Sequence, residues 1–294
     1  MGGFPLQHRW HLDGLVINGD PAVNGGWELA VDPDGVVGWS GSPAPRTSRY
    51  PRIGAHGAYR GPGWRSERIV SMTGWGWAPN PQSRLALEQR LAAWLSDPHR
   101  LYPLRREDLQ SGEDLTLYVE LDDQVLVTPV DAHHVRWSIQ VAAPDPVKYG
   151  AEQSASTALP TRGTGLNWQP GLEWEPGLDW GEPTSRGAVT VSNPGTADVW
   201  PRFRIDGPVI SPEIVVDGRY RLRYAGVVDW GEWLDIDSHP ARRSVILNGS
   251  VPRRLDRAEW RPIPAGGSTD IAFSAASLGN PEALLTVYWS PGYW

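Results

Sequence analysis

The chain has 294 residues and a net charge of −7, with 40% hydrophobic and 21% charged residues. These are ordinary globular values, and the length favours two domains of about 100 to 200 residues. No apolar stretch approaches the roughly 18 residues that span a bilayer, and neither half has the basic excess typical of nucleic-acid binders. We therefore expect no membrane span and no nucleic-acid partner. Cysteine is absent, which excludes disulfides and thiolate metal sites.

The first half of the chain shows short apolar stretches separated by turn residues, a pattern typical of strands. The Pro-Asp-Gly signal within residues 32–35 predicts a tight hairpin. Residues 40–63 are too rich in Gly, Pro and Ser for regular structure and are expected to form a long loop. A second hairpin is expected where Asp122 and Asp123 separate the apolar stretches 115–121 and 124–130.

A single helix is expected over residues 81–96. Asn80 followed by Pro81 is a favourable pair of cap and first-turn residues. Leu85, Ala92 and Leu95, with Glu88 and Leu91 between them, have the three-and-four spacing that predicts one face of an amphipathic helix. One helix among about eight strands makes this domain mainly β.

Residues 151–187 are expected to form a linker between the two domains. They contain the repeat Gly-Leu-x-Trp three times, with Pro170 and Pro176 between the copies. Three copies are too few for a solenoid, so the pattern indicates an extended strap whose side chains dock on a neighbouring surface. The candidate subunit-docking residues are Trp168, Trp174 and Trp180.

The remainder of the chain, residues 188–294, has apolar stretches at short, regular spacing, with Gly, Pro or Asn in nearly every gap. Eight such strands without a helical pattern indicate a β-sandwich of about 100 residues. The expected strands are 188–192, 199–205, 213–216, 219–224, 232–236, 244–247, 270–273 and 284–289.

No residue pattern typical of a catalytic, cofactor or metal site is found. Asp32 and Asp34 before Gly35 resemble the start of a calcium loop, but the third ligand and the distal Glu are missing, which favours a turn. His133 and His134 would point to opposite faces of a strand and could not readily share one metal ion. We therefore expect no catalytic residues, no cofactor and no metal.

Two alternatives to a purely structural role remain open. Glycoside hydrolysis would need two carboxylates at a tertiary separation that a sequence does not show. Tryptophans of a β-sandwich can also stack on sugar rings, as in carbohydrate-binding modules. Trp233 lies in an expected strand and should pack inward, so the candidate contacts with a host cell-wall glycan are Trp230 and Trp260.

Several motifs spread over most of the chain carry a resemblance. In the first half they are Leu12-Asp13-Gly14, Val16-Ile17-Asn18, Arg68-Ile69-Val70 with Gly74, and Asp145-Pro146 with Tyr149. In the second half they are Gly231-Glu232-Trp233 with Ile236-Asp237, and residues 245–249, 260–266, 270–273 and 288–294. Together they resemble the distal tail, or minor tail, proteins of siphophages, especially those that infect actinobacteria. The loop at residues 264–267 and the Trp-rich strap depart from the pattern of that family.

The resemblance implies an N-terminal split β-barrel with one packed helix over residues 1–150, and a galectin-like β-sandwich over residues 188–294. Such proteins form a ring, expected to be a homo-hexamer, under the tail tube at the tail tip of the virion. The implied partners are the tail tube protein and the tail-tip proteins, with a host surface glycan as the alternative. A closed ring would also pair the edge strands of a small split barrel, which need covering.

Overall fold

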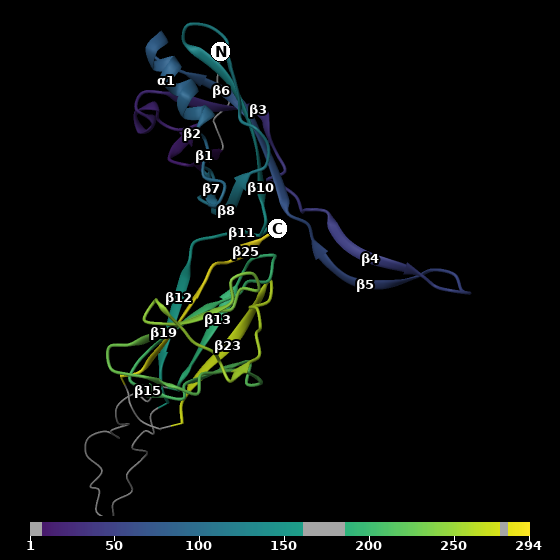
Figure 1. Ribbon diagram of the computed structural model, residues 1–294, viewed down its shortest axis with the longest axis vertical. Coiled ribbons are helices and arrows are strands. Elements are labelled where there is room, and N and C mark those ends of the chain that lie inside the picture. Colours follow the sequence, from purple (N-terminus) through teal and green to yellow (C-terminus); the bar gives the residue numbers. More distant parts are fainter. Residues whose placement is uncertain (1–7, 161–185, 277–281) are drawn as a thin grey trace, which may run out of the picture. The chain divides into compact units, whose positions relative to one another are not determined.

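The computed structural model describes residues 8–160, 186–276 and 282–294 (Figure 1). The chain divides into two compact units, Met1–Ala151 with Tyr293–Trp294, and Glu152–Gly292. The described residues are mainly β with a single α-helix, which confirms the expected fold class. Within the described ranges no helix has the length and apolar character required to cross a membrane.

Ten strands form the main sheet of the first unit, in the order β2-β1-β7-β8-β10-β6-β3, with β9 on β10, β11 on β8 and β25 on β11. A 3-10 helix, η1 (Pro21–Asn24), lies between β2 and β3. The strands are β1 (His8–Leu12), β2 (Leu15–Ile17), β3 (Glu28–Val37), β6 (Arg68–Trp77), β7 (Tyr102–Asp108), β8 (Asp114–Leu121), β9 (Leu126–Pro129), β10 (His134–Ala143), β11 (Lys148–Tyr149) and β25 (Gly292–Tyr293).

The two halves of this sheet enclose one hydrophobic core. They are joined where β8 meets β10, at only two residue pairs. The first and last strands of this order, β2 and β3, are also linked. Asn18, which follows β2, donates its N–H to the carbonyl oxygen of Leu29 in β3 (2.7 Å), and its Oδ1 accepts from the N–H of Val31 (3.1 Å). The arrangement is that of a split barrel.

The prediction of a hairpin at residues 32–35 is wrong. β3 continues through these residues and pairs with β6 on both sides of them, with a register shift between Val31 and Val36. The segment is therefore a bulge, and Gly35 belongs there because a Cβ would collide with the backbone oxygen of Thr73. Turn-forming residues suit a bulge as well as a reversal, so they did not determine the direction of the chain.

The prediction of a hairpin between residues 115 and 130 is also wrong. β8 and β9 both pair antiparallel with β10, so the chain continues in one direction from the first strand to the second. At the junction, the N–H groups of Asp122 and Asp123 donate to the Gln140 carbonyl oxygen (3.0 and 3.4 Å). The polar residues marked the break between two strands but not its geometry.

Helix α1 (Pro81–Ala92) begins where expected and ends four residues before the expected end at Ser96. The Oδ1 of its N-cap, Asn80, accepts from the N–H of Ser83 (2.8 Å), as the cap signal predicted. The predicted apolar face is correct only in part: Leu95 is buried, but Leu85 is 50% exposed and Ala92 is exposed. The buried residues are Leu87, Leu91 and, beyond the helix end, Trp94 and Leu95.

Both sets of residues fit a helical period, so the sequence pattern alone did not separate them. The fold selects the second set because Trp94 lies in the core and its Nε1 donates to the Leu12 carbonyl oxygen (3.2 Å). This contact ties the end of the helical segment to β1.

The second unit is a β-sandwich of two sheets, six strands in the order β12-β24-β14-β19-β20-β21 and five in the order β13-β23-β16-β17-β22. The first sheet comprises β12 (Gln153–Ala158), β24 (Leu284–Trp289), β14 (Arg202–Asp206), β19 (Trp233–Asp237), β20 (Ser244–Leu247) and β21 (Val251–Pro252). The second comprises β13 (Ala188–Asn193), β23 (Gly267–Ser274), β16 (Glu213–Val216), β17 (Tyr220–Arg223) and β22 (Arg257–Ala258), and β15 (Val209–Ile210) pairs separately with β18 (Val227–Val228).

All eight strands expected in this part of the chain are present, as β13, β14, β16, β17, β19, β20, β23 and β24. Strand β12 is an addition, since it lies in the segment 151–187 that was expected to be linker, and it pairs along its length with β24. Its sequence consists of small and polar residues, which give no apolar alternation to detect. The remainder of that segment, residues 161–185, lies outside the described residues.

Replacing Leu87 with Ala is expected to lower the free energy of unfolding by about 2 to 5 kcal/mol, because a fully buried side chain leaves a cavity. The matched change Leu85→Ala, at an exposed position of the same helix, is expected to change it by less than about 0.5 kcal/mol. Chemical denaturation of both variants measures the difference. Equal losses would contradict the buried face seen in the structure.

Candidate assembly surface

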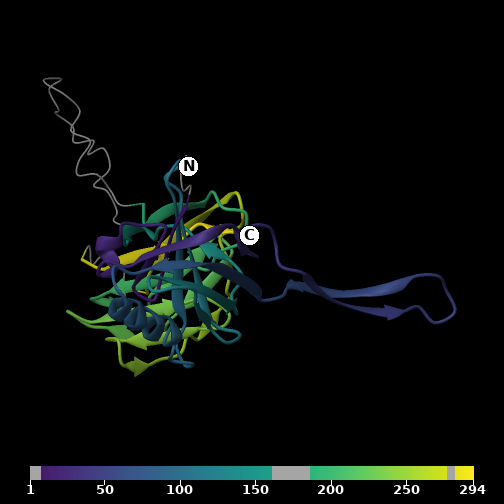
Figure 2. The same cartoon turned by 90° about the horizontal axis from the view of Figure 1, so that it is seen from above.

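Residues expected to form a loop instead form a two-stranded hairpin, here called the arm. It consists of β4 (Pro45–Pro51) and β5 (Ala58–Arg65), which, of the strands that the structure describes, pair only with each other. Figures 1 and 2 show the arm running out from the first unit, clear of its sheet and helix in both views. All but two of its strand residues are exposed. The loop prediction failed because a hairpin that buries nothing has no need of an apolar pattern.

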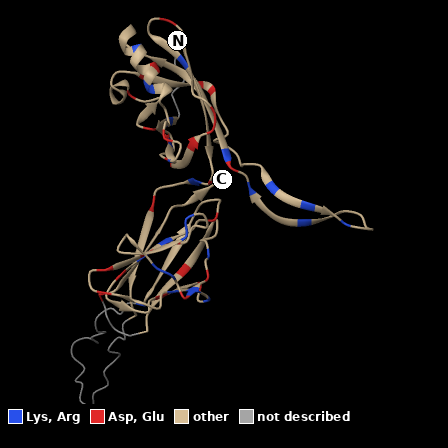
Figure 3. Cartoon of the chain, viewed as in Figure 1, with Lys and Arg blue, Asp and Glu red and all other residues tan. Residues whose placement is uncertain are grey.

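The arm carries positive charge only. Residues 35–66 contain five arginines and no acidic residue, and Figure 3 shows blue without red along the hairpin. Arg49 and Arg60 lie directly opposite each other across the two strands, an arrangement that destabilises an isolated hairpin. Subtracting the five arginines from the net charge of −7 leaves −12 on the rest of the chain.

Aromatic side chains accompany these charges. Tyr50 and Tyr59 are paired across the arm and are 64% and 63% exposed, and Trp64 is 60% exposed. Ile53, near the tip, is fully exposed. Exposed aromatic residues and arginines are the side chains most enriched in protein interfaces. The arm therefore has the composition of a binding surface.

The root of the arm is fixed by a buried arginine. Arg68, the first residue of β6, donates from Nη1 to the carbonyl oxygens of Gly38 (3.0 Å), Trp39 (3.0 Å) and Gly41 (3.1 Å). Its Nε donates to the carbonyl oxygen of Pro146 (3.0 Å). The segment that leaves β3 for the arm is thus tied to the strand that follows the arm. Burial lowers the pKa of the Arg68 guanidinium.

Gly38 makes the departure from β3 possible. Its φ of +91° lies in a region that other residues rarely adopt, and a Cβ there would collide with the backbone oxygen of Ile69. The chain can therefore pass close to β6 as it turns outward. A larger residue would displace the segment that Arg68 binds.

Lys148, the only lysine in the chain, is the second cation at this root. Its Nζ donates to the Trp39 carbonyl oxygen (3.2 Å), and the side chain is buried. Burial, together with the charges of Arg68 and Arg106, lowers the pKa of Lys148 to about 8.

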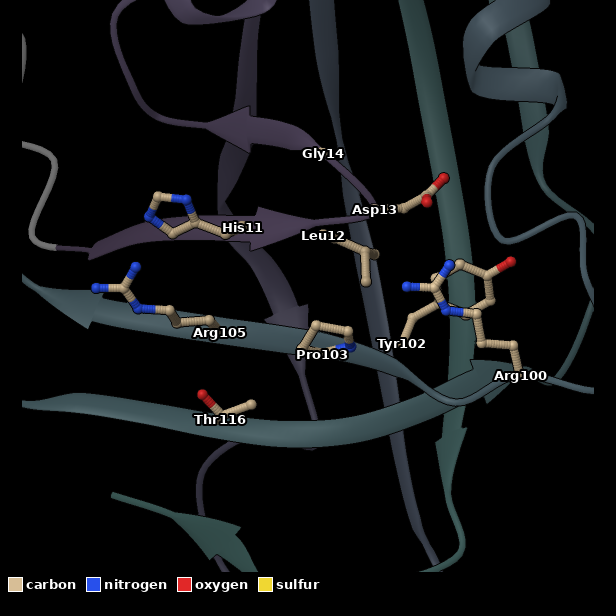
Figure 4. Close-up of a pocket in the computed structure, with 9 residues that line it drawn as sticks. All are labelled: His11, Leu12, Asp13, Gly14, Arg100, Tyr102, Pro103, Arg105 and Thr116. Atoms are coloured by element: carbon tan, nitrogen blue, oxygen red, sulfur yellow. The ribbon is translucent and has the colours of Figure 1, made fainter. Parts of the chain in front are cut away.

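The first unit also has a hollow of about 260 Å³ between β1 and β7, shown in Figure 4. Three of the charged groups that line it already have partners. Arg105 donates from Nε to both carboxylate oxygens of Asp114 (2.7 and 2.8 Å), and Asp13 pairs with Arg90 (3.1 Å). His11 lies 3.4 Å from Glu107. Most of the charge in this hollow is therefore already neutralised within the protein.

The remaining candidates for chemistry are engaged in local bonds. The Asp131 carboxylate accepts from the N–H of His133 (2.7 Å), which, together with bonds from the side chain and N–H of His134, lowers the pKa of Asp131 to about 2. Asp32, considered above for calcium, pairs with Arg136 (2.8 Å). Over the described ranges, no three His, Asp or Glu side chains are grouped closely enough to hold a metal ion.

The candidate glycan contacts are not brought together in one hollow. Trp230 is 71% exposed in the turn before β19, whereas Trp260 is partly buried and lines a hollow of the second unit. Trp233, expected to pack inward, lies on the outer face of β19: its Nε1 donates to Asp235 (3.0 Å), and Leu234 and Ile236 fill the core instead. The candidate docking residues Trp168, Trp174 and Trp180 lie outside the described residues.

Lys148 gives the first unit a pH-dependent stability. Between about pH 8 and about pH 10.5 the unfolded chain holds the Lys148 proton that the folded chain has released, so the free energy of unfolding rises with pH. Below about pH 8 both states are charged, and the folded state bears the full cost of the buried ammonium.

The substitution Lys148→Met removes this titration. On going from about pH 7 to about pH 10, the melting temperature of the wild type is therefore expected to rise relative to that of the variant. Calorimetry of the two proteins at both pH values measures the change. A difference in melting temperature that does not vary with pH would show that Lys148 titrates normally in the folded protein.

No protein-family model matches the sequence, and no curated protein matches it. The structure is similar to the crystal structure of SPP1 Dit (gp 19.1), described as a paradigm of the hub adsorption apparatus in Gram-positive infecting phages. The TM-score is 0.59 at 13% identity, over 98% of this chain and 99% of that one.

Two structures of the phage P2 baseplate in its activated conformation are also similar. The one with Ca has a TM-score of 0.44 at 11% identity, over 92% of this chain and 98% of the other. The one with Sr has a TM-score of 0.47 at 12% identity, over 96% and 97%. The likeness to SPP1 Dit extends over both units of the chain. The protein thus has the fold of a siphophage distal tail protein, as the sequence motifs indicated.

Proposed function

We propose that this chain is a structural protein of a long, non-contractile phage tail, where it forms a ring at the distal end of the tail tube. The ring would join the tube to the tail tip or baseplate. The observation that carries the proposal is the arm, an exposed and cationic hairpin that no described part of its own subunit covers.

A two-stranded hairpin is at best marginally stable in water. The arm is destabilised further because two arginines lie opposite each other and because its tyrosines and Trp64 are exposed to water. Contact with a second surface would remove these aromatic rings from water and neutralise the charges. The arm is therefore built to be completed by a partner.

A second copy of the same chain is the partner that the charges favour. The body of the protein carries −12 without the arm, so each copy offers both the cation and the anion of a contact. An arm that binds a different surface on the next copy gives a head-to-tail contact, and such contacts form a ring when the rotation between copies closes. The resemblance to distal tail proteins makes six copies the expected number.

The full-length match to SPP1 Dit supports this reading, since that protein belongs to a phage hub adsorption apparatus. The proposed partners are accordingly the tail tube protein on one side of the ring and the tail-tip proteins on the other, in the virion. Docking of Trp168, Trp174 and Trp180 on a neighbouring subunit stays a prediction.

The experiment removes the arm at its base, where the N–H of Ser66 donates to the Ala44 carbonyl oxygen (3.0 Å). Residues 45–65 are replaced by a two-residue turn, and mass is measured by light scattering. The full chain is expected to form a closed ring of about six copies, and the variant a folded monomer. A variant with the oligomeric mass of the full chain would contradict the role of the arm.

The charges of the arm are tested separately. The double change Arg49→Gln and Arg60→Gln is expected to weaken self-association about tenfold, and added salt should weaken the wild type as well. Arg202→Gln with Arg219→Gln is the matched control, because both residues are exposed in the second unit and the loss of charge is equal. Equal weakening by both pairs would mean that net charge, and not the arm, drives assembly.

A further inference from the structure

A hollow of about 490 Å³ lies at one edge of the sandwich in the second unit. Its lining comes from the last strands of both sheets, β20 and β21 of one and β22 of the other, and from the connection between β21 and β22. Its volume falls in the range of about 300 to 1,000 Å³ typical of small-molecule sites. We propose that this hollow binds a saccharide that carries an oxyanion, either a phosphate or a carboxylate.

The hollow is cationic and holds no anion of its own. Arg243, Arg253 and Arg254 line it, and no acidic residue does. The ion pairs among the described residues of this unit use other arginines. Arg253 donates from Nη1 to the Pro252 carbonyl oxygen (3.4 Å), and its charge also acts on Glu232, which does not line the hollow. Among the described residues, the other guanidinium donors of the three arginines are left to an external oxyanion, which a guanidinium group binds through two parallel hydrogen bonds.

One of these arginines is held in place by aromatic rings. The guanidinium of Arg243 lies over the rings of Trp200 and Trp260, at 5.7 and 5.3 Å from their centroids. Stacking on an indole restricts a side chain that would otherwise be mobile, so less entropy is lost when it binds. The two tryptophans therefore orient a charged group at the rim of the hollow.

The rest of the lining suits the apolar face of a sugar ring. Trp260 is only partly buried, and Val245, Pro252 and Leu255 add apolar surface beside it. A pyranose ring presents a flat patch of C–H groups that packs on such a surface, while its hydroxyl groups remain in water. An acidic peptide would satisfy the arginines but has no comparable flat apolar face. The combination of arginine and indole thus favours a saccharide.

The proposal does not depend on ring formation, because the hollow lies within one copy of the second unit. It keeps Trp260 as a contact for a glycan, as considered above, and adds that this glycan is negatively charged. Trp230 does not line the hollow and is not part of the proposed site.

The test is calorimetric titration of the full-length chain with four ligands. They are a glycosylated poly(glycerol phosphate), an oligogalacturonate, the neutral maltohexaose and polyaspartate. Binding of either anionic saccharide, together with weak or no binding of the neutral sugar, is the expected result. Whether the phosphate polymer, the uronate or both bind identifies the oxyanion.

Variants locate the binding. Arg243→Gln, and Arg253→Gln with Arg254→Gln, are each expected to weaken affinity about tenfold or more, because each removes a charge-assisted pair of hydrogen bonds. Trp260→Leu is expected to weaken binding of the saccharide without changing the charge of the hollow. Arg219→Gln is the control: Arg219 is also exposed and also lies over an aromatic ring, that of Tyr220, but does not line the hollow.

Three outcomes would overturn the proposal. They are no binding of either anionic saccharide, equal loss of affinity in the Arg219 control, and binding of polyaspartate at least as tight as that of the saccharides. The last would assign the hollow to an acidic protein segment. Since the substituted arginines are exposed, melting temperatures close to that of the wild type are expected and would exclude unfolding as the cause.

Discussion

The bonds from Arg68 to the backbone at the root of the arm are the constraint on which the first unit depends. A guanidinium removed from water needs acceptors, and here the three carbonyl oxygens of residues 38, 39 and 41 supply them. No carboxylate is needed for this arrangement. The cation is held by the chain segment whose path it fixes, so the start of β6 and the exit from β3 are positioned together.

Lys148 acts on the same segment from β11, so two cations converge on the carbonyl oxygen of Trp39. Burial of the ammonium group and, after it, the nearby charges of Arg68 and Arg106 make this cluster costly and lower the pKa of Lys148. The structural result of the cluster is a fixed base for an otherwise unsupported hairpin.

The sequence predicted those elements that bury an apolar face. The eight strands of the sandwich were found because residues such as Phe203 and Ile205 alternate with exposed neighbours, and α1 because Asn80 and Pro81 mark its start. Residues 32–35 and 122–123 were wrongly predicted to reverse the chain. Turn-forming residues indicate an interruption in regular strand pairing, but they do not show whether the chain then reverses or continues in the same direction. In α1, the set of residues that begins at Leu85 and the set that begins at Leu87 both have helical spacing, and only the tertiary packing shows which set is buried.

The candidate assembly surface was missed for a related reason. Its strands bury nothing, so no alternation reveals them, although the run of five arginines without an acid was already visible in the sequence. The hollow beside Trp260 was half anticipated, because the tryptophan could be singled out by its type. Its arginines come from several separate positions and converge only in the folded sandwich.

The uniform charge of the arm also bears on what the protein avoids. Exposed hairpins have free edges, and free edges invite pairing with identical strands of other molecules, the route to aggregates. Two arms that met edge to edge would bring ten arginines together with no acid among them. Mutual repulsion therefore opposes pairing between arms, and it does not oppose the proposed contact with a surface of opposite sign.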